Sequence, residues 1–264
     1  MDLQLTGKLA LVTGSTTGIG YAIAKSLAAE GAHVIVNGRT EARVKSAVDT
    51  IQSEVPGATV HALAADLSTA EGVAKTVETF PGVDILVNNL GIFEPKAFEE
   101  ITDEDWYRFF EVNVMSGIRL SRAYLAGMKD KNWGRIIFIS SESSIMIPSE
   151  MIHYGFTKTA QLSVSRGLAE LTQGTGVTVN AVLPGPTASE GVSTFVGELA
   201  KERGLSQDEM ETEFFRTMRP SSLLQRFASV DEVANLVTYV ASPLSSATNG
   251  AALRVDGGLV RSIL

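Results

Sequence analysis

The amino-acid sequence predicts one α/β domain, and three observations lead to this prediction. Short apolar runs alternate along the chain with longer segments whose apolar residues recur at helical spacing. The first run, a glycine-rich turn, a helical segment and the second run together complete a β-α-β unit. No internal repeat, low-complexity tract or linker interrupts residues 1–264, so a single domain is the simplest arrangement.

The composition fits a compact globular protein. Of 264 residues, 44% are hydrophobic and 20% are charged, and there is no cysteine. The lack of cysteine excludes disulfides, thiolate metal sites and a cysteine nucleophile, and it is compatible with a reducing compartment. The histidines His33, His61 and His153 lack metal-ligand spacing, so we interpret them as surface or strand-end residues and expect no metal.

Charge and hydropathy restrict the partners and the location. A net charge of -8 disfavours a nucleic-acid surface. No apolar run approaches the ~18 residues of a membrane span, and residues 1–5 lack the basic start and apolar core of a signal peptide. We therefore expect a cytoplasmic protein with neither membrane nor nucleic acid as a partner.

The alternation gives the following elements. Strands are expected at 8–13, 33–37, 59–64, 83–87, 135–140, 177–183 and 251–255. Helices are expected at 21–30, 41–55, 68–79, 102–131, 154–172 and 229–241. Ser68 is the expected N-cap of the third helix, and Ser229 with Glu232 forms a capping box for the last one.

Residues 188–226 break this alternation. Apolar residues such as Phe195 and Phe214 lie among many charges, and Ser206 with Glu209 forms a capping box for a helix through Met218. Because the segment directly follows the C-terminal end of a strand, we predict two short amphipathic helices that cover the substrate as a lid. The alternative is that these helices pack permanently on the core.

The turn after the first strand is a candidate pyrophosphate site, with glycines at 14, 18 and 20. Backbone amides at a helix start can approach a pyrophosphate only where no Cβ intervenes, and the helix N-terminus favours negative charge. The spacing Gly-x-x-x-Gly-x-Gly departs from the common dinucleotide fingerprint. A tight structural turn is therefore the alternative.

The end of the second strand favours NADP over NAD. An acidic residue there receives the adenosine ribose hydroxyls of NAD, whereas an arginine accommodates the extra phosphate of NADP. Gly38 takes the place of the acid, and Arg39 follows it. The alternative is an arginine that is solvated in a turn.

Polar residues also follow the later strands. Asp66 follows the third, Asn88 and Asn89 follow the fourth, and serines at 140, 141, 143 and 144 follow the fifth. The amide of Asn113 lies in an apolar stretch of a long helical pattern, where it should have a partner.

Tyr154 and Lys158 lie four residues apart in a predicted helix, so they share one face. A free tyrosine has a pKa of ~10, and a nearby ammonium lowers that value and favours proton exchange. By itself, the pair is also common in helices without any catalytic role.

Taken together, these features resemble the short-chain dehydrogenase/reductase family over nearly the whole chain, from Leu5 to Gly258. Each motif is common, but their joint order is highly specific. In order they are Thr13-Gly14-x-x-x-Gly18-x-Gly20, Asp66, Asn88-Asn89-x-Gly91, Asn113, Ser141, Tyr154, Lys158, Pro184-Gly185 and Asp256-Gly257-Gly258. The resemblance implies a Rossmann-like, doubly wound parallel sheet of about seven strands in one domain.

The resemblance also implies hydride transfer between a nicotinamide cofactor and a carbonyl or secondary alcohol. Tyr154 would exchange the proton, Ser141 would hydrogen-bond the substrate oxygen, and Lys158 would lower the pKa of Tyr154 and hold the nicotinamide ribose. Asn113 would hold a water that relays protons from Lys158 to solvent. A catalytically silent nucleotide-binding regulator or scaffold is the alternative from another class, and a 3-oxoacyl thioester reductase is the alternative among enzymes.

The cofactor contacts that the resemblance implies are spread along the chain. They assign Gly14, Gly18 and Gly20 to the pyrophosphate, Asp66 to the adenine, Asn88 to the adenosine pocket, and Thr187 with Ser189 to the nicotinamide carboxamide. The other residues expected at the cofactor are Ser15, Thr17, Ile19, Gly38, Arg39, Leu67, Leu90, Gly91, Tyr154, Lys158, Pro184 and Gly185.

Three departures from the family pattern affect these assignments. Leu90 replaces the usual alanine and would crowd the adenosine ribose, and Ser189 replaces a usual threonine. The glycine turn lacks the basic residue of many NADP-using members, so Arg39 would provide most of the discrimination, and dual use of NADPH and NADH is the alternative. Family members usually pair the helices equivalent to 102–131 and 154–172, so we expect a homotetramer in which residues 260–264 seal a second interface.

Overall fold

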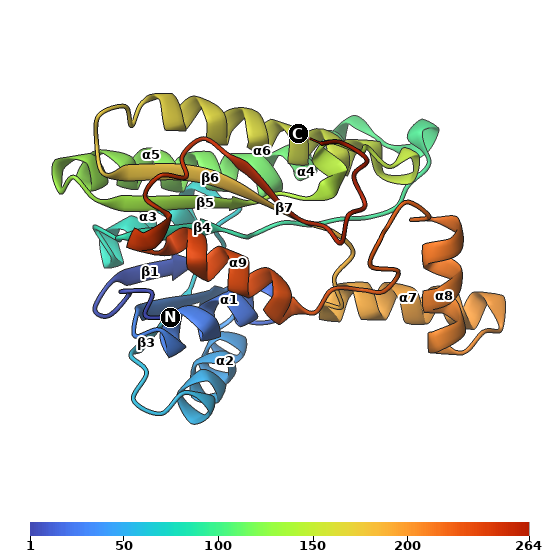
Figure 1. Cartoon of the computed structure of the whole chain (residues 1–264), viewed down its shortest axis with the longest axis horizontal. Coiled ribbons are helices and arrows are strands. Elements are labelled where there is room, and N and C mark those ends of the chain that lie inside the picture. The colour runs from blue at the N-terminus through green and yellow to red at the C-terminus, as the bar shows by residue number, and fades with distance from the viewer. Residues whose placement is uncertain (264) are drawn as a thin grey trace.

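A seven-stranded, fully parallel sheet runs through the computed structural model within the described residues, 1–263 (Figure 1). The strand order is β3-β2-β1-β4-β5-β6-β7. The order reverses between β1 and β4, as in a doubly wound sheet, so the predicted fold class is confirmed. The strands are β1 Leu9–Val12, β2 His33–Gly38, β3 Val60–Ala64, β4 Ile85–Asn88, β5 Gly134–Ile139, β6 Val177–Pro184 and β7 Ala252–Val255.

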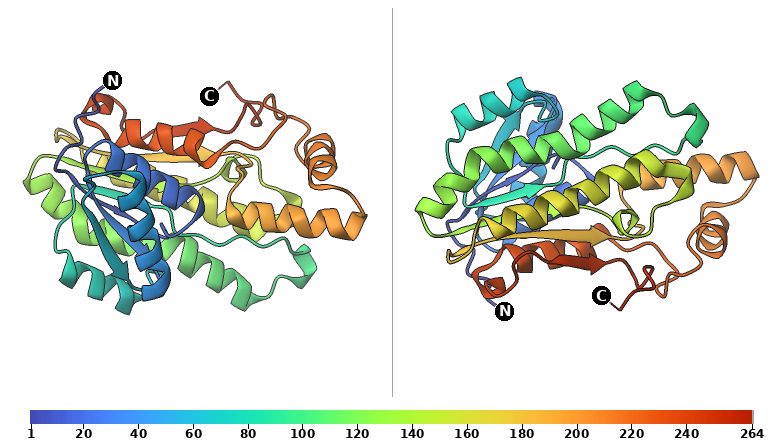
Figure 2. Two further views of the ribbon diagram at one scale, coloured as in Figure 1. Left: turned by 90° about the horizontal axis from the view of Figure 1, so that it is seen from below. Right: turned by 90° about the horizontal axis from the view of Figure 1, so that it is seen from above.

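Helices cover both faces of the sheet, and each face has its own apolar cluster (Figure 2). One face is covered by α1 Gly18–Ala29, α2 Glu41–Glu54 and α9 Val230–Ala241. The other is covered by α3 Ala70–Thr79, α5 Ser116–Asp130 and α6 Ile152–Glu170. Because both faces are buried, the strands are apolar throughout rather than alternating. No helix within residues 1–263 is long and apolar enough to cross a membrane.

The long helix expected at 102–131 is interrupted. It consists of α4 Asp103–Phe110, a π-helical turn at Glu111–Met115, and α5. The π turn contains Asn113, and π turns often occur at functional sites because the wider turn redirects side chains. The capping boxes expected at Ser206 and Ser229 are confirmed.

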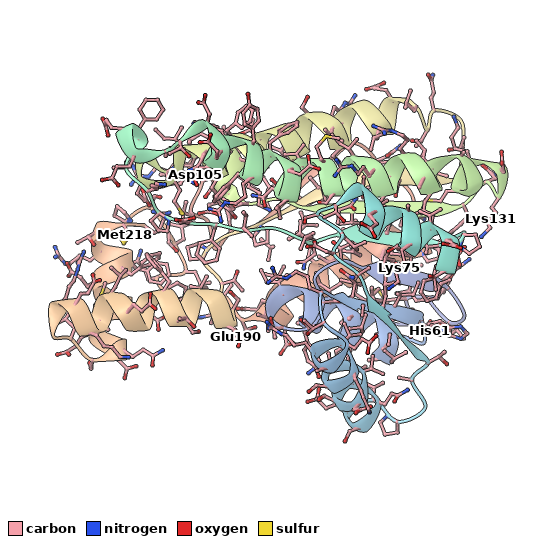
Figure 3. The ribbon with its side chains drawn as sticks, turned by 180° about the vertical axis from the view of Figure 1, so that it is seen from behind. His61, Lys75, Asp105, Lys131, Glu190 and Met218 are labelled. Atoms are coloured by element: carbon pink, nitrogen blue, oxygen red, sulfur yellow. The ribbon has the colours of Figure 1, made fainter. Side chains whose placement is uncertain are left out.

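Two helices extend beyond the carboxyl ends of the strands. They are α7 Glu190–Arg203 and α8 Gln207–Thr217, and their own apolar cluster is separate from the clusters under the sheet (Figure 1). Figure 3 shows Glu190 at the start of α7 and Met218 just after α8. The two amphipathic helices predicted within 188–226 are therefore present.

The expected N-cap of α3 is wrong by one residue. The hydroxyl of Thr69 accepts a hydrogen bond from the Gly72 amide at 3.0 Å. Ser68 instead donates its hydroxyl proton to Asp66 Oδ1 at 2.7 Å, because its backbone belongs to the turn before the helix. Ser68 and Thr69 both have a hydroxyl that could cap the helix, and the preceding turn determines that Thr69 is the N-cap.

This difference predicts unequal stability effects at adjacent positions. Thr69→Ala should lower the free energy of unfolding by ~1 kcal/mol because an amide of the first turn loses its partner. The matched control Ser68→Ala removes only an exposed hydrogen bond and should cost less than about 0.5 kcal/mol. Urea denaturation of both variants measures the difference, and a larger loss in Ser68→Ala would contradict the assignment.

Candidate active site

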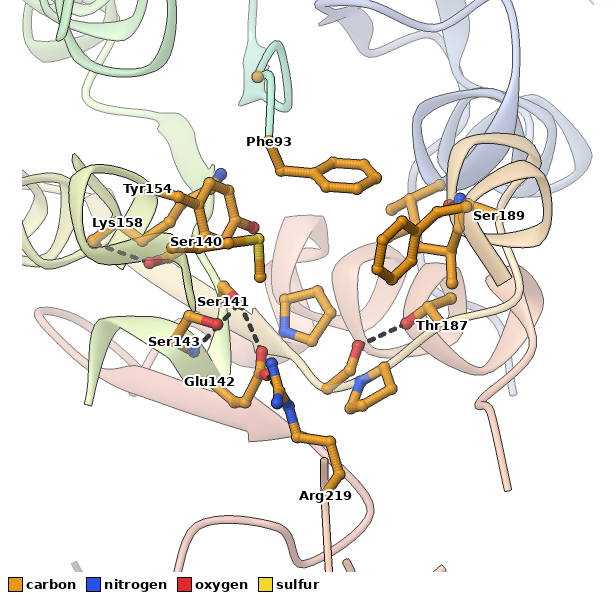
Figure 4. Close-up of a pocket in the computed structure, with 18 of the residues that line it drawn as sticks. Phe93, Ser140, Ser141, Glu142, Ser143, Tyr154, Lys158, Thr187, Ser189 and Arg219 are labelled. Carbon is orange, nitrogen blue, oxygen red and sulfur yellow. Dashed lines mark hydrogen bonds and ion pairs between the residues drawn. The ribbon is translucent and has the colours of Figure 1, made fainter. Parts of the chain in front are cut away.

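A cleft of about 220 Å³ opens at the carboxyl edge of the sheet, beneath α7 and α8 (Figure 4). Its lining comes from the helix after the glycine turn, the loops after β4, β5 and β6, helix α6, and the α7–α8 segment. Parallel strands in register bring these loops to one edge although they are far apart in sequence. The cleft contains Ser141, Tyr154 and Lys158, as predicted.

Tyr154 lies in the first turn of α6, beside Ser141 at the end of β5 (Figure 4). Burial raises the pKa of the Tyr154 phenol above its usual value, and the nearby charge of Glu142 raises it further, while a hydrogen bond with Ser141 opposes the shift. The phenol is therefore protonated near neutral pH, and in this structure it is a weaker acid than a free tyrosine.

Lys158 lies one turn further along α6, and its ammonium donates to the carbonyl of Ile139 at 2.9 Å. Burial lowers the pKa of Lys158 to about 8, although the Glu142 charge opposes the shift. The expectation that Lys158 lowers the pKa of Tyr154 is not met in this structure. The amine is held at the Ile139 carbonyl, 5.6 Å from the Tyr154 ring centroid, and burial of the phenol is the larger effect.

The Asn113 side chain has the partners that its position requires. Its Oδ1 accepts from the Ile92 amide at 2.8 Å, and its Nδ2 donates to the Ile92 carbonyl and to Thr157 Oγ1, both at 3.0 Å. Its backbone carbonyl accepts from Gln161 Nε2 at 2.6 Å. Asn113 thus joins the loop after β4 to α6, and its expected role in a proton relay stays a prediction.

The glycine turn fits a dinucleotide pyrophosphate. Gly14 and Gly18 have positive φ angles of 60° and 59°, and a Cβ on Gly20 would lie 2.4 Å from the Gly14 carbonyl oxygen. Within the described chain, the Thr17 side chain makes no capping bond to α1. The first amides of α1 are therefore available to phosphate oxygens.

Asparagine side chains hold this turn in place, a role that was not predicted for Asn37. Asn89 Nδ2 donates to the carbonyls of Thr13 at 2.9 Å and Gly14 at 3.1 Å. Asn37 Oδ1 accepts from the Gly14 amide at 3.1 Å. Ser15 is fully buried and bonds to β1 and β2, so its side chain serves the turn. Their place at strand ends was the only signal available in the sequence.

The end of β2 differs from an NAD site in a specific way. A Cβ on Gly38 would lie 2.6 Å from the Thr16 methyl carbon, so Thr16 fills the space where an acidic side chain would begin. Arg39 is exposed at the adjoining position. Arg43, which the sequence analysis did not consider, lines a shallow hollow with Thr16 and Thr17.

The remaining cofactor candidates lie in the core, at the ends of β3 and β4, or in the cleft. Leu67 is buried in a core cluster, and Leu90 packs against the same cluster. Asp66 is exposed at the surface and Asn88 is buried with its Nδ2 donating to Ser121 Oγ at 3.2 Å. Ile19, Gly91, Pro184, Gly185, Thr187 and Ser189 line the cleft. The Ser189 hydroxyl caps α7, so the expected carboxamide site adjoins the start of the lid helices.

His153 corrects an expectation from the sequence. It was interpreted as a surface or strand-end residue, but it is fully buried at the start of α6. Its ring lies 4.0 Å from the Phe109 ring between centroids, and neither ring nitrogen has a partner among the described residues. Packing between α4 and α6 accounts for its burial, and a single-residue pattern could not reveal that contact.

Charged residues from distant segments also meet in the cleft. Glu142 lines the cleft next to Ser141. Arg219, from the segment after α8, lies 3.7 Å from Glu142 and 3.0 Å from Glu150. Only the folding of the α7–α8 segment over the sheet brings them together.

Known proteins share this arrangement. The family model for short chain dehydrogenases matches residues 8–198. An uncharacterized oxidoreductase of Bacillus subtilis, YvaG, is 55% identical over the whole of both chains. The D-beta-hydroxybutyrate dehydrogenase of Cupriavidus necator is 35% identical over 97% of this chain and 99% of its own.

A solved structure has the same fold. L-sorbose reductase from Gluconobacter frateurii, in complex with NADPH and L-sorbose, superposes over all of both chains with a TM-score of 0.94 at 32% identity. The family match extends from the glycine turn through the Ser141, Tyr154 and Lys158 group to α7. The chain therefore belongs to the short-chain dehydrogenase/reductase family, as the resemblance implied.

Proposed function

We propose that this oxidoreductase uses NADPH to reduce a ketone or aldehyde carbonyl, with Tyr154 as the proton donor and the reverse oxidation also possible. The observation that carries the proposal is the meeting of Ser141, Tyr154 and Lys158 in one cleft. The glycine turn, with its open helix amides, lies at the same edge of the sheet. A silent nucleotide-binding protein would have no chemical reason to retain all three groups.

The residues of the cleft divide the chemistry among themselves. NADPH supplies the hydride when it is bound. The protonated Tyr154 donates its proton to the carbonyl oxygen. The Ser141 hydroxyl, which donates to Glu142 in this structure, would redirect its one proton to the same oxygen as negative charge develops on it. Lys158 holds the nicotinamide ribose, and its pKa of about 8 keeps part of its population charged near neutral pH.

The preference for NADPH rests on the end of β2. An acid at Gly38 would repel a 2′-phosphate, and Thr16 occupies the space that such a side chain would need. Arg39 offers planar, charged donors that match phosphate oxygens. The NADPH bound in the similar L-sorbose reductase structure supports this choice of cofactor.

The α7–α8 segment serves as a cover for an organic substrate. Phe195, Phe214 and Met218 present apolar surface to the cleft, which favours a substrate with an apolar part. A 3-oxoacyl thioester reductase is the second candidate, favoured by these apolar walls. Screening a mixed panel of carbonyl compounds with NADPH separates the two.

A cytoplasmic homotetramer completes the proposal. The faces of α4 and α6 expose aromatic residues, with Tyr107 73% and Phe156 48% exposed. Pairing these faces across a two-fold axis would bury them. Of the C-terminal segment 260–264 proposed for a second interface, Leu264 lies outside the described residues.

The assembly predicts a mass that can be measured directly. Light scattering at micromolar protein concentration should give about four times the 28.1 kDa of one chain. The expected reason is burial of the aromatic α4 and α6 faces between copies. A mass of one chain would contradict the proposed tetramer.

The role of Tyr154 predicts a selective loss. Tyr154→Phe should lower kcat for carbonyl reduction by roughly a hundred- to ten-thousandfold, because the proton donor is removed. NADPH binding, followed by its fluorescence change, should be nearly intact. Unchanged turnover would rule out Tyr154 as the acid.

The role of Arg39 predicts a change in cofactor choice. Arg39→Ala should weaken NADPH binding by roughly ten- to a hundredfold through loss of one charged contact, with NADH little changed. Lys45→Ala is the control, since Lys45 is an exposed cation of α2 that lies outside the hollow and pairs with Asp49 at 2.6 Å, and it should cost less than about threefold. Equal kcat/KM values for NADPH and NADH in the unmutated enzyme would instead show dual use.

A further inference from the structure

A buried carboxylate, Glu142, and a partly buried guanidinium, Arg219, lie in the cleft, and the proton and hydride steps do not use them. Glu142 is only 6% exposed, and its Oε2 accepts a hydrogen bond from Ser141 Oγ at 2.5 Å. Its Oε1 lies 3.7 Å from Arg219 Nε (Figure 4). Burying charge is costly, so this pair at the reacting end of the cleft requires an explanation.

The position of Glu142 determines which part of a substrate it meets. In the proposed function Ser141 contacts the reacting oxygen, and the Glu142 carboxylate is the next group beyond that same hydroxyl. In a substrate, the next polar atom beyond the reacting oxygen is a substituent on the neighbouring carbon. That substituent therefore faces Glu142 and Arg219.

The charges of Glu142, Arg219 and Glu150 determine which substituent fits. Arg219 is shared by Glu142 and by Glu150, whose Oε1 lies 3.0 Å from Arg219 Nη1, so two carboxylates face one guanidinium. A substrate carboxylate at this position would be repelled by Glu142, and an ammonium would be repelled by Arg219. A hydroxyl can donate to the carboxylate and accept from the guanidinium.

The titration of Glu142 does not alter the fit of a hydroxyl group, whereas the repulsion of a substrate carboxylate requires the ionised form. Burial raises the pKa of its carboxyl, while Ser141, Arg219 and Ser143 oppose the shift; Tyr154 and Lys158 of α6 also face it. Both the ionised and the neutral carboxyl can hydrogen-bond a hydroxyl group. The apolar walls from α7 and α8 then accept the remaining carbon chain.

We propose that Glu142 and Arg219 form a subsite for a hydroxyl on the carbon next to the reacting carbonyl. The substrates are then α-hydroxy ketones that are uncharged at the reacting end, with vicinal diols as the products of their reduction. This inference rests on the proposed function, because it assigns a substrate class to the same cleft.

Three ketones with the same butyl chain test the subsite. Hexan-2-one, 1-hydroxyhexan-2-one and 2-oxohexanoate differ only in the group next to the carbonyl, which is a methyl, a hydroxymethyl or a carboxylate. With NADPH, kcat/KM for the hydroxyketone should exceed that for hexan-2-one by roughly ten- to a hundredfold. The 2-oxohexanoate should be the poorest substrate of the three.

Variants assign the preference to Glu142. In Glu142→Leu the ratio of the hydroxyketone to hexan-2-one should fall to about one, because the acceptor is lost. The ratio is informative even if Ser141 is disturbed, since both ketones share that effect. In Glu142→Gln, which retains hydrogen bonding but not charge, the penalty against 2-oxohexanoate should decrease. Glu198→Gln is the control, because Glu198 is an exposed carboxylate of α7 outside the cleft lining, and it should keep the hydroxyketone ratio. NADPH fluorescence reports the folding of each variant.

The outcomes separate this inference from the proposed function. Turnover of all three ketones without a preference for the hydroxyketone, or with a preference for 2-oxohexanoate, overturns the subsite and leaves carbonyl reduction standing. A preference that survives in Glu142→Leu also overturns it. No turnover of any carbonyl compound despite NADPH binding overturns the proposed function, and the subsite with it.

Discussion

The site depends on the parallel pairing of β4 with β1 on one side and with β5 on the other. In this register Val12 lies opposite Val87 and Asn88 lies opposite Phe138, so the three strands end at nearly the same level. The Asn89 amide can therefore reach back to the carbonyls of Thr13 and Gly14. The glycines permit the turn, but the paired strands fix its shape, since the bonds that hold it come from a neighbouring strand end.

Burial decides the protonation states in the cleft more than the nearest opposite charge does. Tyr154 and Lys158 both shift toward their neutral forms, because removal from water penalises a phenolate and an ammonium alike. Lys158 retains a partner at the Ile139 carbonyl, and that bond also fixes α6 against β5. A neutral phenol beside Ser141 is the state required of a proton donor.

Local signals in the sequence were enough to predict the strands, most helices and the two capping boxes, because each depends on residues close together in the chain. The π turn at Asn113 was not predictable from periodicity, since α4 and α5 continue nearly the same apolar pattern on either side of it. Ser141, Tyr154 and Lys158 were identified because their order along the chain is distinctive. Arg219 was missed because its contacts with Glu142 and Glu150 span about seventy residues and exist only after the α7–α8 segment has folded over the sheet.

The same guanidinium connects the substrate side of the cleft with the position of the lid helices. The apolar cluster of α7 and α8, which includes Met210, Phe214 and Phe215, is separate from both sheet clusters. Arg219 follows α8 directly, and its bonds reach carboxylates in two segments between β5 and α6. The strength of an ion pair of this kind depends on how far its two charges are removed from water. A polar group that entered between Glu142 and Arg219 would therefore change the contact between the segment after α8 and the loop after β5.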